Sequence, residues 1–226
     1  MALLEAGYLL LVTTLGQALL AGVVLIVLPL VVFAPLAHTG RRLRWQVFAY
    51  FTGIGLAFLF IEIAFLQKLV LLVHHPTVAL ALALAVFLVG AGLGSAWSSR
   101  VRPARSRHAL VMAVAGIVVL GVVCGAVFDT SIGALAAWPT TARAVVAAVL
   151  LAPLAFCMGL PLPLALRELD EPLVPWAWGI NGCASVVSAA LATLLAVDLG
   201  FSVVLWLALA LYLAVPAVFP GRVVVR

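Results

Sequence analysis

The chain has 226 residues, of which 67% are hydrophobic, twelve are basic and seven are acidic. So few charges cannot cover the surface of a soluble protein of this length, and so high an apolar fraction excludes a disordered chain. The composition therefore indicates a chain that lies in a lipid bilayer. The basic excess does not predict a nucleic-acid partner, because most arginines fall in short runs between apolar stretches and are topology signals.

The N-terminal segment does not resemble a cleaved signal peptide. Residues 1–8 contain Glu5 and no basic residue, and the apolar run that follows is too long for a signal sequence. We therefore expect a retained transmembrane helix there.

Seven stretches in all are long enough to cross about 30 Å of hydrocarbon. They are residues 9–36, 47–73, 78–97, 109–128, 144–166, 173–197 and 201–219. The prediction is an all-α integral membrane protein, a bundle of about seven helices that forms a single transmembrane domain over residues 1–226.

The breaks between these stretches predict the orientation of the chain. The breaks at 38–46, 98–108 and 167–172 and the C-terminal tail together hold ten basic residues, whereas the opposite side holds only Arg143. Cytoplasmic loops carry the excess of arginine and lysine in membrane proteins. We therefore expect the N-terminus outside and the C-terminus in the cytoplasm.

Small residues predict where the helices pack against each other. Two GxxxG pairs occur, Gly90 with Gly94 and Gly121 with Gly125, and such pairs let helix backbones approach closely in lipid. The glycines of 90–94 also resemble a nucleotide-binding loop, but the required strand before them is absent, so helix packing is favoured. Prolines at 153, 161 and 163 are expected to kink or end the fifth span.

Glu62 is the first candidate for a functional side chain. It lies near the middle of the second span, about 22 Å from its cytoplasmic end. A carboxyl group at that depth is costly when ionised, so it is expected to be protonated, paired or in contact with water. Lys68 is rotated about 120° from Glu62 around the helix and can instead extend to the outer interface. Ser188 is predicted at a similar depth and offers a hydrogen bond.

Two interpretations of Glu62 stay open at this point. Glu62 is either a proton or cation site on a pathway, or a protonated carboxyl that fixes helix packing through a hydrogen bond. In the sixth span, Asn181, Ser185 and Ser188 recur at helical spacing and form a weakly polar stripe. These three residues are further intramembrane polar candidates.

The remaining reactive residue types do not form a recognisable site. His74 and His75 precede Pro76 in the outer turn, where adjacent side chains rarely reach one metal ion, so a cap on the second span is favoured. The three cysteines lie in apolar stretches without CxxC spacing and predict no disulfide. We predict no metal, no cofactor and no catalytic residue, and the chain alone is not expected to be an enzyme.

Several segments together give the chain a family resemblance. They are YFTGIGLAFLFIEIAFLQK (50–68), HHPT (74–77), GAGLGS (90–95), GLPLPLALR (159–167), LVPWAWGINGCASVVSA (173–189) and GFS (200–202). In order and spacing they resemble the membrane portion of bacterial membrane-bound spermidine-synthase-like proteins. The resemblance implies the bacterial cytoplasmic (inner) membrane. It places Glu62, His75, Pro76 and Asn181 on motif positions of the family, whereas His74 stands where a glycine is usual.

The resemblance also suggests a class of partner. The helices of that family accompany a soluble aminopropyltransferase-like or methyltransferase-like domain, and no stretch of this sequence has the α/β pattern of such a domain. The leading expectation is therefore a non-catalytic membrane subunit or anchor that packs with a protein partner, either such an enzyme or a larger membrane complex, among membrane lipids. The alternative is a small proton- or cation-linked transporter that uses Glu62, with Asn181 and Ser188 along the path. An intramembrane enzyme is the least supported function.

Overall fold

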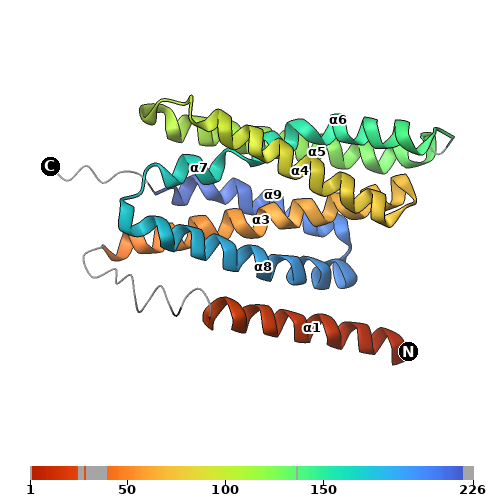
Figure 1. The fold of residues 1–226 in the computed structure, drawn as a ribbon, viewed down its shortest axis with the longest axis horizontal. Coiled ribbons are helices and arrows are strands. Elements are labelled where there is room, and N and C mark those ends of the chain that lie inside the picture. The colour runs from red at the N-terminus through yellow and green to blue at the C-terminus, as the bar shows by residue number, and fades with distance from the viewer. Residues whose placement is uncertain (1, 25–27, 29–39, 136, 221–226) are drawn as a thin grey trace. The chain divides into compact units, whose positions relative to one another are not determined.

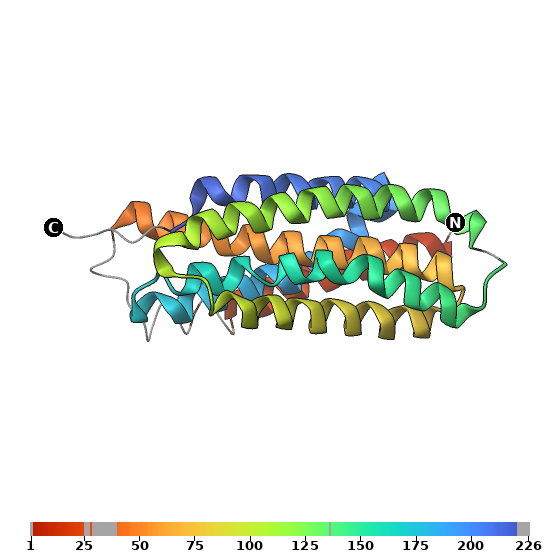
Figure 2. The same cartoon turned by 90° about the horizontal axis from the view of Figure 1, so that it is seen from above.

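The computed structural model describes residues 2–24, 28, 40–135 and 137–220. All the regular structure within these residues is helical (Figures 1 and 2). Six segments in them are long and apolar enough to cross a membrane. The prediction of a multi-span helical membrane protein is therefore confirmed.

Six of the seven predicted spans coincide with long helices of the structure. These helices are α3 (Arg41–Val73), α4 (Pro76–Ser98), α5 (Ser106–Ala134), α6 (Thr140–Met158), α8 (Val174–Leu199) and α9 (Phe201–Ala214). The first predicted span, 9–36, overlaps α1 (Ala2–Gly22), whose apolar part Leu9–Gly22 is shorter than the other six spans. Most of its second half lies outside the described residues. A seventh span therefore stays a prediction.

Several helices extend beyond their predicted bounds. Helix α3 begins at Arg41, so the arginines assigned to the first loop belong to its first turns. Helix α5 continues to Ala134, which places Asp129 in a helix although the predicted span ends at residue 128. Charged side chains do not end a helix where they reach the headgroup region, because long polar side chains are solvated there. Hydropathy alone marks only the apolar part of such a helix.

The fifth span is interrupted between Met158 and Pro161, as the prolines predict. Helix α6 ends at Met158, and the short helix α7 (Pro161–Leu166) begins at Pro161. A proline is well tolerated at the first position of a helix, where its missing N–H has no partner to lose. Pro153 lies inside α6 and does not end it.

The chain forms two compact units, whose boundaries fall inside α3 and α7. Unit 1 comprises residues 1–60 and 165–226; there α8 packs against α1 and α9 (Figure 1). Unit 2 comprises residues 61–164; there α6 packs against α4 and α5 (Figures 1 and 2). The single transmembrane domain expected for residues 1–226 stays a prediction, and each unit is described by itself.

Within unit 2, glycines make the contact between α4 and α6 possible. A Cβ atom on Gly94 would overlap the carbonyl oxygen of Phe156, and a Cβ atom on Gly90 would lie 2.6 Å from Cβ of Ala155. A Cβ atom on Gly159, which follows α6, would likewise overlap the backbone of Ala91. Without a hydrophobic driving force between helices in lipid, this close backbone contact is a main source of association. The other predicted packing residues, Gly121 and Gly125, are buried on α5.

Candidate functional site

Glu62 lies in α3 eleven residues before the end of the helix, about 16 Å along its axis. Because the hydrocarbon core is about 30 Å thick, this distance corresponds to the middle of a bilayer. The side chain is half-buried. It forms no hydrogen bond or ion pair with any other residue that the structure describes. Glu62 is thus a carboxyl group at mid-span depth without a partner in the described part of the chain.

Lys68, one of the predicted polar candidates, has a partner in unit 2. Its ammonium group forms an ion pair with Oδ1 of Asp129 in α5. Lys68 is buried, whereas the Asp129 side chain is largely exposed. The expectation that Lys68 extends to the interface omits this partner, because Asp129 is 61 positions away in sequence and lies just beyond the apolar stretch 109–128. A buried ammonium group needs a countercharge, and the ion pair ties the second half of α3 to α5.

Arg143 is the other buried cation of unit 2, although the sequence alone indicates only a loop charge. One of its terminal nitrogens, Nη1, donates to the carbonyl oxygen of Leu72 at 2.6 Å and lies 2.8 Å from Nδ1 of His74. Nη2 donates to Oγ1 of Thr140 at 3.3 Å. An arginine has no acceptor, so Nδ1 of His74 accepts and carries no proton. The guanidinium group therefore closes the C-terminal end of α3, whose last carbonyls lack partners in the helix.

His74 ends α3 in a conformation that is unusual for its residue type. Its φ angle is 62°, and its backbone N–H donates to the carbonyl oxygen of Val70 at 3.0 Å. Helices often end with one residue in this left-handed region, and that residue is most often glycine. His75 then precedes α4 without a side-chain cap, and Pro76 starts the helix. The two histidines thus form the connection between the helices, with His74 held by Arg143.

In unit 1, the polar stripe of α8 contacts α3. The Ser188 hydroxyl donates to the carbonyl oxygen of Leu56 at 2.9 Å, so its proton is not available to another acceptor. Ser185 donates to the carbonyl oxygen of Asn181 within α8, also at 2.9 Å. A Cβ atom on Gly55 would lie 2.8 Å from that same Asn181 oxygen. These residues therefore support a close contact between α3 and α8.

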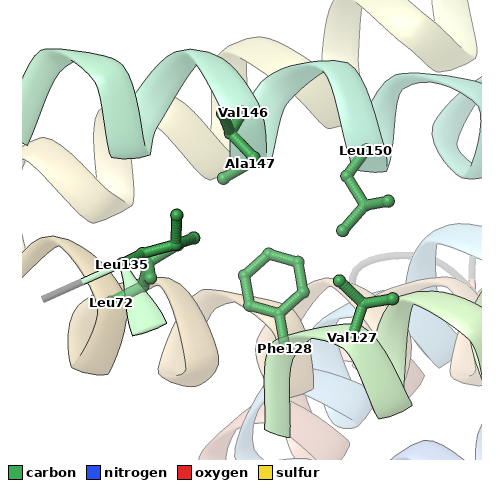
Figure 3. Close-up of a pocket in the computed structure, with 7 residues that line it drawn as sticks. All are labelled: Leu72, Val127, Phe128, Leu135, Val146, Ala147 and Leu150. Atoms are coloured by element: carbon green, nitrogen blue, oxygen red, sulfur yellow. The ribbon is translucent and has the colours of Figure 1, made fainter. Parts of the chain in front are cut away.

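Two pockets of unit 2 are lined almost entirely by hydrocarbon side chains. One has a volume of about 30 Å³, and all seven side chains that line it are hydrocarbon (Figure 3). Sites for small molecules have volumes of about 300–1,000 Å³, so this pocket is far too small for a substrate. A larger groove of about 400 Å³ on α5 and α6 is also apolar, and its Cys124 thiol donates to the carbonyl oxygen of Leu150 at 3.4 Å.

Within the described ranges, no three His, Cys, Asp or Glu side chains are grouped so that they could hold a metal ion. The three cysteines are free thiols in separate helices. The polar groups of this region can therefore hold helices together and bind hydrogen-bonding partners. They do not form an arrangement of nucleophile, base and oxyanion donors.

Comparison with protein-family models, curated proteins and solved structures finds no match to this chain. The family resemblance of the six sequence segments therefore stays a prediction. The structure itself supports a multi-span helical membrane protein.

Proposed function

We propose that this chain is a non-catalytic membrane subunit that packs against a protein partner within the bilayer, with Glu62 at the contact. The observation that carries the proposal is the half-buried Glu62 carboxyl at mid-span depth, which has no partner among the described residues. Lys68 and Arg143, the two buried cations described in unit 2, both have partners within the chain.

A carboxyl group that faces hydrocarbon has a high free energy even when it is protonated, because its O–H and C=O groups lack hydrogen-bond partners. A donor or acceptor on a neighbouring transmembrane helix satisfies them. Intramembrane polar contacts of this kind contribute about 0.6–2 kcal/mol each to helix association. Glu62 would therefore both strengthen such a contact and fix its register.

The apolar linings of these two unit 2 pockets agree with a role in assembly. By family resemblance, the first partner to consider is an aminopropyltransferase-like or methyltransferase-like enzyme, and the second is a larger membrane complex. The rival function is a proton- or cation-linked transporter, in which Glu62 itself takes up and releases the transported ion. That function needs an ionisable group, whereas a packing contact needs only hydrogen bonding.

Glu62→Gln and Glu62→Leu separate these functions. Glutamine keeps the shape and hydrogen bonding of a protonated carboxyl, and leucine removes the hydrogen bonding at similar volume. The chain is extracted gently from its own membranes and examined by native mass spectrometry, with every co-purifying protein identified. We expect a stoichiometric partner with the unchanged chain and with Glu62→Gln, and its loss with Glu62→Leu.

Leu66→Ala is the matched control, because Leu66 is also half-buried and lies one turn further along the same face of α3. It should leave the partner bound. A chain that never carries a protein partner would contradict the proposal, and so would a partner that Glu62→Leu retains. A partner-free chain whose solute uptake is abolished by Glu62→Gln would instead establish transport.

A further inference from the structure

A second feature, in unit 1 and independent of Glu62, is a pocket between the first turns of α3 and α8. It is lined by Arg44, Val47, Phe48, Leu173, Trp176 and Ile180 and has a volume of about 160 Å³. Five of these six side chains are apolar or aromatic, and the sixth is an arginine. The pocket is too small for a typical small-molecule substrate, but it has room for one flexible segment of a hydrocarbon chain.

The residues of α3 that line this pocket share one face of the helix. Arg44, Val47 and Phe48 stand three and four positions apart, which places them side by side along α3. Trp176 and Ile180 are related in the same way on α8. The pocket is therefore a short groove between two helices, with a cationic group in the second turn of α3 and apolar side chains further along.

The cations at this end of α3 have no partner within the described chain. Arg41, Arg42 and Arg44 are exposed, and none of them forms an ion pair or a side-chain hydrogen bond with another described residue. Arginines in the first turns are also unfavourable for the helix itself, because the N-terminal end of a helix carries a partial positive charge. These three exposed arginines can therefore attract an anion.

The aromatic side chains around the pocket indicate its depth in the membrane. Trp45, next to Arg44, and Trp178, two residues after Trp176, are both exposed. Tryptophan is enriched at the boundary between headgroups and hydrocarbon. The arginines therefore lie at the level of lipid phosphates, and the apolar groove begins at the level of the first methylene groups.

We infer that this pocket binds one anionic phospholipid, whose phosphate is held by Arg44 and whose acyl chain begins in the groove between Phe48 and Ile180. Arg41 and Arg42 add attraction for the negative charge. Arginine binds phosphate oxygens through two parallel hydrogen bonds, and basic pockets between transmembrane helices are a recurrent type of lipid headgroup site.

The test measures binding of phosphatidylglycerol, phosphatidylcholine and inorganic phosphate to the detergent-solubilised chain, by native mass spectrometry and by thermal stabilisation. We expect one phosphatidylglycerol per chain, weaker retention of phosphatidylcholine and no stabilisation by inorganic phosphate. Arg44→Gln should weaken phosphatidylglycerol binding about tenfold, because a hydrogen bond between charged groups is lost. Ile180→Trp fills the groove without changing any charge and should weaken binding similarly.

Arg107→Gln is the matched control. Arg107 is an exposed arginine of α5, and its loss changes the net charge by the same amount. It should leave the single phosphatidylglycerol bound. Equal effects of Arg44→Gln and Arg107→Gln, with none from Ile180→Trp, would show only general attraction to anionic lipid and overturn the site. Full competition by inorganic phosphate, or a dimer of the chain in place of the lipid adduct, would overturn it as well.

Discussion

His74 shows how one residue connects backbone conformation with a side-chain contact. Its left-handed backbone costs about 1–2 kcal/mol for a residue with a Cβ atom, and glycine avoids this cost. We expect His74→Gly to be more stable than His74→Ala by about that amount, although both lose the acceptor for Arg143. The order reverses the usual preference for alanine over glycine near a helix. Thermal unfolding of the two purified variants measures it.

The control for this prediction is His75→Gly against His75→Ala. His75 has an ordinary extended backbone, with φ at −131°, so glycine gains nothing there. A His74→Ala variant as stable as His74→Gly would contradict the left-handed conformation of this residue.

At the scale of residues, the sequence indicates which side chains are unusual but not which ones meet. Glu62 and Lys68 stand out because charges are rare within apolar stretches. The partner of Lys68 could not be predicted, because Asp129 lies on another helix and at the edge of its apolar stretch. For the same reason, the sequence indicates only a loop charge at Arg143 and not its hydrogen bond to Leu72. Contacts between distant positions depend on how helices pack, and hydropathy carries no information about that.

At the scale of helices, the contact between α4 and α6 gives a sharp prediction. A methyl group on Gly94 would overlap the carbonyl oxygen of Phe156, whereas no atom of another described helix lies within 4 Å of the Cβ position of Gly92 in the same helix. Gly94→Ala should therefore destabilise the chain by about 1–3 kcal/mol, the usual cost of overpacking. Gly92→Ala is the matched control and should leave the stability unchanged or slightly raised.

The melting temperatures of the two variants and the fraction that elutes as a single folded species check this prediction. Equal behaviour of Gly92→Ala and Gly94→Ala would contradict a close contact between α4 and α6.

The spacing of the glycines predicts that they pack against a helix, but the choice of α6 as that helix depends on the tertiary fold. The six long helices themselves were predictable from the sequence, because each contains an apolar run long enough to cross a bilayer.

At the scale of the whole molecule, burial sharpens the prediction of orientation from basic charge. The structure shows which basic residues are exposed, and only exposed ones count as loop charges. Arg143, the one basic residue assigned to the outer breaks, is 9% exposed and donates to Leu72. Lys68 is buried as well. Every exposed arginine that the structure describes therefore lies in a segment predicted to face the cytoplasm.

Single cysteines at exposed positions test this orientation and the number of spans together. Gly7, Ser99 and Ala137 are exposed, and each is replaced by cysteine in a chain whose three native cysteines are alanine. In spheroplasts, we expect a membrane-impermeant maleimide to label Gly7→Cys and Ala137→Cys at once. Ser99→Cys, between α4 and α5, should react only after the membrane is opened. Labelling of Ser99→Cys alone in intact spheroplasts would reverse the orientation. Labelling of Ala137→Cys without Gly7→Cys would mean that α1 does not cross the membrane and that the chain has six spans.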